Sequence, residues 1–271
     1  MAPIVTNPYR FAAAAGVTGF DVANATYTGD SFSVASQETI PQGLSFAGAG
    51  SYMYLFGSAT PDAIYQYDLT TPYDITTASY TASVATHSAA TNTTGGYMKE
   101  DGTEVYYCDS SANSVFQSTL STAYDITTAT HTAIVTAPDS ATLGMFMREN
   151  GTELWTCGIG LDRVYRQIMS TPWDITTAGT ATNLYIGTWG NSPNGVYVKP
   201  DGTKFWVIDD QYNRIVEFDM STSWDVTTGT WNLYKTGIHD GTPTELTFSA
   251  NGNWMYEMGI NTDTIYKWDC S

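Results

Sequence analysis

The feature that most constrains this chain is a short motif that it repeats. The letters "YDITTA" begin at Tyr73 and again at Tyr124, and they return as "WDITTA" at Trp173 and "WDVTTG" at Trp224. Successive copies are separated by about 50 residues. A fixed period of this length predicts a repeat architecture, in which one small unit of secondary structure is stacked several times.

A second marker follows the same period and reveals a fifth copy. It is an Asp-Gly or Asn-Gly pair, replaced by Ala-Gly in the first copy, and it occurs at Ala49-Gly50, Asp101-Gly102, Asn150-Gly151, Asp201-Gly202 and Asn251-Gly252. Asp-Gly and Asn-Gly pairs are the strongest short-range signal of a β-hairpin turn.

Each copy contains four short segments of strand character. The hairpin pair lies between the first two, as in "GYMK" and "EVYYCD", and the YDITTA motif lies between the third and the fourth. Turns recur about every 8–12 residues, which leaves no room for helices. Four antiparallel strands repeated five times predict an all-β fold, a five-bladed β-propeller.

The third strand of each copy carries one polar residue between apolar neighbours. These residues are Gln66, Gln117, Arg166, Glu217 and Lys267. The alternation predicts that one face of the strand is solvated and the other is packed.

The two ends of the chain indicate how the ring closes. The chain stops at "IYKWDCS", which matches a third strand, and "FDVANATYTGDSFSV" from Phe20 aligns with "YDITTASYTASV" of the first copy. An N-terminal strand can thus complete the last blade, whereas an open solenoid would need capping repeats. We expect a propeller over residues 20–271 after an arm of residues 1–19, with residues 20–34 paired beside 264–269.

One aspartate occupies the same slot of the motif in every copy: Asp21, Asp74, Asp125, Asp174 and Asp225. A carboxylate there can accept a hydrogen bond from a backbone N–H two residues on, which forms an Asx-turn. A catalytic group is needed once per active site rather than once per blade. We therefore interpret these residues as structural, with metal binding at each turn as the alternative.

The charge of the chain excludes two classes of partner. There are 27 acidic and 10 basic residues, which gives a net charge of −17. This charge repels nucleic acid and anionic membranes. No apolar run approaches the roughly 18 residues of a membrane span, and the N-terminus lacks the basic region of a secretory signal. We expect no nucleic-acid binding, no membrane insertion and no signal peptide.

The residues at hand carry no recognisable catalytic constellation. The chain has three histidines and no G-x-S-x-G nucleophile motif. Cys108 and Cys157 stand where other copies have Phe56, Ile208 and Met258, so we expect them in the core. We predict no catalytic residue, no cofactor and no enzyme activity.

The repeat resembles that of β-propeller proteins of tailed bacteriophages and aquatic bacteria. The likeness is carried by "VKPDGTKFWVIDDQYNRIVEFDMSTSWDVTTG", from Val198 to Gly229, and "IYQYDLTTPYDITTA", from Ile64 to Ala78. It covers roughly residues 20–269 and carries over no catalytic residue. The resemblance implies a structural protein of the virion or cell surface, often linked to adhesion. This chain departs from the repeat pattern at one position of the last copy, where Glu245 replaces the glycine of the first strand.

Loops between the fourth strand and the next first strand differ most among the copies, so we look there for a ligand site. They present Glu38, His87, Asp139, Trp189, Asn191, His239 and Asp240. Carboxylates, amides and an indole could bind a sugar through hydrogen bonds and stacking. Carboxylates and carbonyls could also hold Ca²⁺. The alternative is a solvated loop face without a ligand.

The N-terminal arm lies outside the repeat and is apolar. It contains Pro3, Pro8, Tyr9 and Phe11, and we expect it to dock the propeller onto other virion proteins. The alternative is a disordered terminus.

These observations favour a non-enzymatic virion protein, such as a capsid decoration, fibre or tail component made in the host cytoplasm. It would be displayed outward and would contact a host-surface glycan. A soluble carbohydrate-binding propeller is the alternative, and a glycan hydrolase, which would need two carboxylates about 5–10 Å apart, is a third reading.

Overall fold

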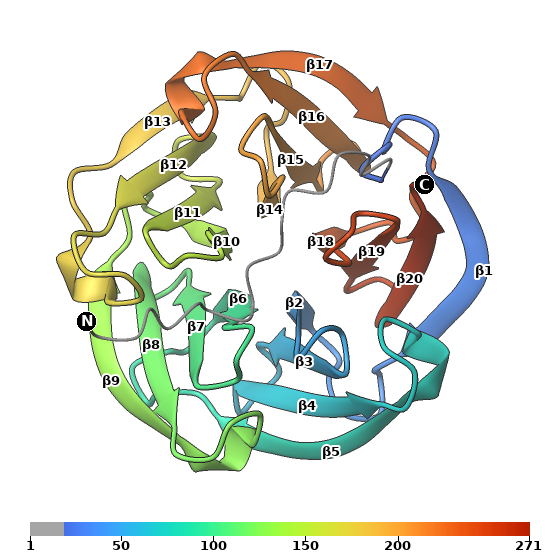
Figure 1. Ribbon diagram of the computed structural model, residues 1–271, viewed down its shortest axis with the longest axis vertical. Helices are drawn as coiled ribbons and strands as arrows, with labels where there is room; N and C mark the ends of the chain where they lie inside the picture. The colour runs from blue at the N-terminus through green and yellow to red at the C-terminus, as the bar shows by residue number, and fades with distance from the viewer. Residues whose placement is uncertain (1–18) are drawn as a thin grey trace, which may run out of the picture.

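The computed structural model describes residues 19–271, which form a ring of five four-stranded antiparallel sheets (Figure 1). The predicted five-bladed β-propeller is therefore confirmed. The helical elements among these residues are four short 3-10 turns. None of them is long and apolar enough to cross a bilayer.

Each blade lays its strands from the centre of the ring to its rim. The innermost strands are β2 (Pro41–Ala47), β6 (Thr93–Met98), β10 (Thr142–Met147), β14 (Pro193–Val198) and β18 (Pro243–Phe248). The second strands are β3 (Tyr52–Gly57), β7 (Glu104–Asp109), β11 (Glu153–Gly158), β15 (Lys204–Asp209) and β19 (Trp254–Gly259). Figure 1 shows the innermost strands surrounding the axis of the ring.

The third strands are β4 (Ala63–Leu69), β8 (Ser114–Leu120), β12 (Arg163–Ile168), β16 (Arg214–Met220) and β20 (Thr264–Asp269). The rim strands are β5 (Ala78–Ala85), β9 (Ala129–Thr136), β13 (Thr182–Tyr185), β17 (Gly229–Lys235) and β1 (Thr26–Ser33). Blades 1 to 5 are numbered here from β2 to β18. Because neighbouring strands are antiparallel, successive connections alternate between two faces of the disc.

We call these two faces the turn face and the loop face. The turn face carries the hairpins between first and second strands and the turns between third and fourth strands. The loop face carries the connections between second and third strands and the links from one blade to the next. The variable links identified in the sequence therefore lie on the loop face.

The ring closes as the sequence predicts. Strand β1 pairs antiparallel with β20, with Thr26 opposite Asp269 and Phe32 opposite Ile265. The first described strand and the last strand of the chain thus share blade 5, beside β19 and β18. We call this junction the seam.

The repeated motif holds the turn face together. In blade 3, the Trp173 N–H donates to the carbonyl of Gly151 at 2.8 Å, and the Trp173 ring lies where a Cβ on Gly151 would be. Both residues have positive φ, 67° and 70°. The same pairing occurs in the other blades, at Tyr73 and Gly50, Tyr124 and Gly102, Trp224 and Gly202, and Phe20 and Gly252.

In four blades the motif aspartate accepts from the backbone N–H two residues on, as predicted, and there it caps a short 3-10 turn. The turns are η1 (Ile75–Thr77), η2 (Ile126–Thr128), η3 (Ile175–Thr177) and η4 (Val226–Thr228). In η1, the Asp74 carboxylate accepts from the Thr76 N–H at 3.1 Å and from its hydroxyl at 2.6 Å. At the seam no 3-10 turn forms, and Asp21 instead accepts from the Asn24 N–H at 3.2 Å.

The expectation of a solvated face on the third strands is wrong. Four of the five polar residues are buried, with exposed fractions of 3–8%, and Arg166 is partly buried. The reason is that both faces of a propeller blade pack against neighbouring blades, so a polar residue there needs a partner rather than water. Gln66 Oε1 accepts from the Ile126 N–H of the next blade at 3.0 Å, and Gln117 Oε1 accepts likewise from Ile175 at 3.2 Å.

These polar residues also pair within their own blades, with a chemistry that changes from blade to blade. In blade 3, the Arg166 guanidinium binds both Glu153 oxygens, at 2.7 and 3.0 Å. In blade 4 the charges are exchanged, and Lys204 donates to Glu217 at 2.6 Å.

Candidate functional site

Three of the seven predicted ligand residues are buried carboxylates that hold the loop face together. Glu38, Asp139 and Asp240 are at most 1% exposed. Their oxygens accept hydrogen bonds from backbone N–H groups of their own links and of the loop between second and third strands. Asp139 Oδ1, for example, accepts from Ala141 at 3.0 Å and from Gly160 at 2.9 Å. These carboxylates do not face a solvent-accessible ligand site.

The corresponding carboxylate comes from a different position in blades 2 and 4. There Asp109 and Asp209, the last residues of the second strands, are fully buried. Asp109 accepts from the N–H groups of Thr91, Asn92 and Ala112 at 2.5–2.7 Å. Each blade therefore has a buried carboxylate at one of these two positions, and blade 5 has a second buried acid, Glu257, that accepts from the same link.

The acid comes either from the link or from the end of the second strand. The residue at whichever of these two positions lacks the acid is small in every blade. Where the link supplies the acid, the second strand ends in glycine, and these glycines are Gly57, Gly158 and Gly259. Where the strand supplies it, the link has Ala90 or Gly190. A Cβ on any of the three strand glycines would collide with the acid of its link. The two positions thus share one space.

His87 forms a partly buried pair with a histidine that the sequence did not indicate. Its ring lies 4.2 Å from the ring of His131 on β9, centroid to centroid. The His87 Nδ1 accepts from the Ala89 N–H at 3.1 Å, which places a neutral ring's proton on Nε2. Burial and the neighbouring His87 lower the pKa of His131.

His239 lies on the loop face of blade 5 against aromatic rings. It is 4.2 Å from Tyr27, 5.0 Å from Tyr266 and 5.2 Å from Trp268, centroid to centroid. The backbone N–H of His239 donates to the carboxylate of the fully buried Glu257. Burial raises the pKa of Glu257 to about 7, although hydrogen bonds from the Asp240 and His239 backbone and from Trp268 favour its charged form.

Trp189 and Asn191 lie on the link of blade 4. Trp189 packs edge-on against Phe218 at 6.0 Å, and its carbonyl accepts from Arg214 at 2.6 Å. Asn191 is exposed. The seven predicted residues are thus distributed around the ring, one or two per blade, and they do not converge on one site.

Ca²⁺ is the other ligand considered for these loops, and the described residues form no evident cage for it. Within residues 19–271, no three His, Cys, Asp or Glu side chains gather in a way that could hold a metal ion. The predicted docking residues Pro3, Pro8, Tyr9 and Phe11 lie outside the described residues.

Glu245 lies on β18, the innermost strand of blade 5, near the axis of the ring. Glycines let the innermost strands approach closely, since a Cβ on Gly144 would meet the backbone of Gly195. Glu245 replaces the equivalent glycine, and its Oε1 lies in front of Gly195. Burial raises the pKa of Glu245 well above its usual value. Cys108 and Cys157 are buried free thiols, as predicted.

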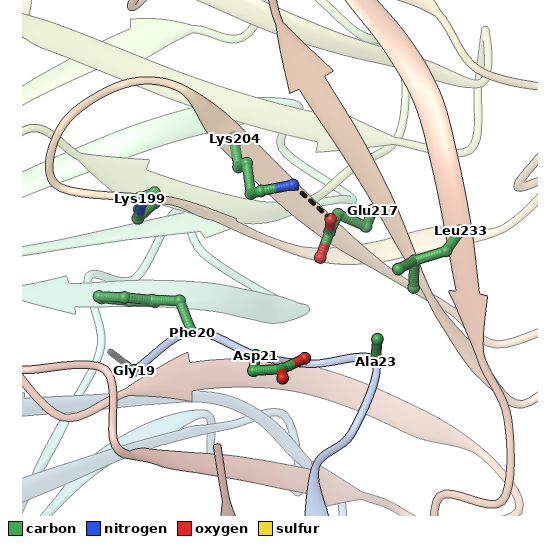
Figure 2. A pocket seen from close by; sticks show the side chains of 8 residues that line it. All are labelled: Gly19, Phe20, Asp21, Ala23, Lys199, Lys204, Glu217 and Leu233. Atoms are coloured by element: carbon green, nitrogen blue, oxygen red, sulfur yellow. Dashed lines mark hydrogen bonds and ion pairs between the residues drawn. The ribbon is translucent and has the colours of Figure 1, made fainter. Parts of the chain in front are cut away.

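A cavity of about 340 Å³ opens at the seam, between blade 4 and the segment that leads into β1. We call it the seam cavity. It is lined by Gly19, Phe20, Asp21, Ala23, Lys199, Lys204, Glu217 and Leu233. Figure 2 shows Lys204 and Glu217 on one side, and Phe20 and Asp21 on the other.

The seam cavity lies where the repeated turn is interrupted. In the other blades, a continuous chain runs from the third strand through the 3-10 turn to the rim strand. At the seam these parts come from opposite ends of the chain, and the Asp21 N–H donates to the Cys270 carbonyl at 3.2 Å. Sequence reasoning missed this site because it searched the variable links of the other face.

The polar groups of the seam cavity form a partly saturated network. Glu217 accepts from Lys204 at 2.6 Å, from Asn232 at 2.7 Å and from the Trp206 indole at 2.7 Å. Burial lowers the pKa of Lys204, but its hydrogen bonds to Asp219 and Glu217 outweigh this effect and raise it. Lys204 is therefore charged.

A smaller cavity of about 200 Å³ lies at the equivalent junction of blades 3 and 4. Its lining includes Arg148 and Trp224, and the guanidinium carbon lies 4.0 Å from the Trp224 ring centroid. Arg148 is also ion-paired with Glu153. The cation and the ring are thus already paired with each other there.

Comparison with known proteins supports the fold alone. No family model matches the chain, and no curated protein matches it significantly. A solved structure described as a "putative 6-phosphogluconolactonase" from Bacteroides uniformis ATCC 8492 is similar, with a TM-score of 0.52, 13% identity and coverage of 80% of this chain and 63% of that one. A functionally unknown protein from Desulfotomaculum acetoxidans DSM 771 has a TM-score of 0.53 and 11% identity, with coverage of 83% and 71%. At this identity the likeness shows a shared propeller architecture.

Proposed function

We propose that this chain is a non-enzymatic structural protein of a virus particle, displayed outward as a decoration, fibre or tail component that contacts the host surface. The repeat's resemblance to propellers of tailed bacteriophages supports this role. The structural observation that carries it is that every blade uses a buried carboxylate to hold its loops. The acids that the sequence offered for ligand binding or catalysis stabilise a rigid disc instead.

The arm supplies the attachment in this proposal. Residues 1–19 precede the ring, and their apolar composition fits contact with another protein. A rigid disc on such an arm can present its faces to the surroundings without rearranging. The net charge of −17 keeps displayed copies from associating with one another.

The test is recovery of the chain from purified particles. Particles from the host that carries this gene are banded on a density gradient, and the chain is quantified by mass spectrometry against the major capsid protein. A constant ratio across preparations is the expected result. A chain lacking residues 1–19 should fold as judged by circular dichroism, yet be missing from the particles. Absence of the full-length chain from particles of cells that express it would refute the proposal.

A second candidate, a carbohydrate-binding propeller, is favoured by the seam cavity. Charged groups, an aromatic ring and aliphatic side chains converge there, as they do in sugar sites. A glycan hydrolase finds less support, because Glu38, Asp139 and Asp240 are buried and bonded to backbone N–H groups.

A further inference from the structure

We propose that the seam cavity binds a carboxylated sugar unit, such as a hexuronic acid within a surface polysaccharide. This inference deepens the host-contact part of the proposed function and rests on it. The cavity would receive the sugar carboxylate at Lys199 and Lys204, its hydroxyl groups at Asp21, and its C–H face at Phe20 and Leu233.

The cations of the cavity have donors to spare. Lys204 donates to Glu217 and Asp219, and Lys199 is paired with Asp201 at 2.8 Å. An ammonium group has three donors. Among residues 19–271, one donor of Lys204 and two of Lys199 therefore have no hydrogen-bond partner, and their side chains are 28% and 24% exposed.

The acids of the cavity are more nearly saturated than the cations. Glu217 already accepts three hydrogen bonds, from Lys204, Asn232 and Trp206. Asp21 accepts two, both from Asn24, and keeps lone pairs for hydroxyl donors. The cavity thus offers open cationic donors at Lys199 and Lys204 beside open acceptor positions at Asp21, and this combination fits a ligand that carries both a carboxylate and hydroxyl groups.

The apolar part of the cavity provides a fixed surface. Phe20 is 6% exposed, and its ring stacks on Trp206 at 5.8 Å and packs against Phe248 at 5.2 Å. Leu233 comes from the rim strand of blade 4 and faces the cavity (Figure 2). A volume of about 340 Å³ lies near the lower end of small-molecule sites and suits one or two sugar rings.

The lysine at the equivalent junction of blade 2 is more heavily paired, although Lys199 also lies over a ring, 6.0 Å from the Phe20 centroid. In blade 2, Lys99 holds the position of Lys199, and it is paired with both Asp101 and Glu104 at 3.2 Å while lying 5.1 Å from the Trp173 ring centroid. It lines neither of the two cavities described above. Lys99 is therefore a matched control for Lys199.

Binding should also strengthen the seam. The ligand would bridge Phe20 and Asp21, which precede β1, to Lys199 and Lys204 of blade 4. A ligand that binds only the folded, closed ring raises the melting temperature in proportion to the logarithm of its concentration.

The test is a titration of the full chain with a diglucuronide and with its neutral diglucoside counterpart, followed by calorimetry and thermal unfolding. We expect the diglucuronide to bind at least about tenfold more tightly, the difference expected for one hydrogen bond to a charged group. Lys199→Gln should weaken binding by a similar factor, and Lys99→Gln should leave it unchanged. Ala23→Glu, which adds a negative charge at the rim, should abolish it.

The inference would be overturned by no binding of the diglucuronide, by equal binding of the neutral sugar, or by equal losses in the two lysine variants. Titration with acetate separates a sugar site from a simple anion site, and acetate binding as tight as that of the diglucuronide would also overturn it. Free glucuronate and a glucuronate polymer distinguish a monosaccharide from a polysaccharide as the natural source. Because the isolated chain is used, failure here leaves incorporation into particles unaffected, and the converse also holds.

Discussion

The Glu38 carboxylate occupies the space that a side chain on Gly57 would need. Its Oε1 accepts from the N–H groups of Ile40 at 2.7 Å and Ala59 at 3.2 Å, and so joins the two loops of blade 1. In blade 2 the same task belongs to Asp109, at the position that Gly57 holds in blade 1. Every blade thus has an acid at one of these two positions and a small residue at the other.

This relationship predicts that an acid introduced at position 57 compensates for loss of the acid at position 38. Glu38→Ala should lower the free energy of unfolding by roughly 2–4 kcal/mol, because two backbone donors lose their acceptor. Gly57→Asp alone should also destabilise, since two carboxylates would compete for one space. The double variant reproduces the arrangement of blade 2 and should recover much of the loss, as measured by urea denaturation. Losses that simply add would argue against a shared space.

The exchanged ion pairs of blades 3 and 4 allow a second double-variant test. Arg166→Glu should cost about 3–5 kcal/mol, because it leaves the 3% exposed Glu153 side chain beside a second acid. Adding Glu153→Lys produces the charge order of Lys204 and Glu217 and should restore more than half of the loss. Chemical denaturation of the four proteins gives the coupling energy. No coupling would mean that the pair does not act as a unit.

A third prediction separates backbone conformation from packing at two glycines. Gly237 and Gly151 both have positive φ, 77° and 70°, but a Cβ would meet nothing within 4 Å at Gly237 and would collide with the Trp173 ring at Gly151. Gly237→Ala should therefore cost about 1–2 kcal/mol, from conformation alone. Gly151→Ala should cost clearly more, because the ring must also move. Similar melting temperatures for the two variants would contradict the packing of Trp173 on Gly151.

Glu257 predicts a pH dependence of stability in blade 5. Its pKa of about 7 in the folded protein lies above the ordinary value of 4.5, so the folded state holds the proton more tightly than the unfolded state. The contribution is fully present below about pH 4.5 and is lost as pH rises through about 7, with a maximum near 3 kcal/mol. Glu257→Gln should remove this component. The measurement is the difference in unfolding free energy between the two proteins from pH 4.5 to 8, and a constant difference would contradict the raised pKa.

The sequence predicts the repeat, the blade count and the closing strand because these follow from local periodicity. It does not reveal that Gln66 and Glu217 are buried, because alternation looks the same whether a polar side chain meets water or a partner from another segment. Likewise, Glu38 in a variable link looks exposed until the end of β3 is placed beside it. The seam cavity arises where the chain is discontinuous within a blade, which no repeat alignment displays.

Closure of the ring by β1 underlies both the fold and the seam cavity, and native-state hydrogen exchange measures it directly. The amide groups of residues 26–33 that bond to β20 should exchange as slowly as those of residues 264–269, since both open only with the whole blade. Peptide-resolved mass spectrometry of the exchanging protein distinguishes the two segments. Rapid exchange throughout residues 26–33, while residues 264–269 stay protected, would contradict a ring closed by its first strand.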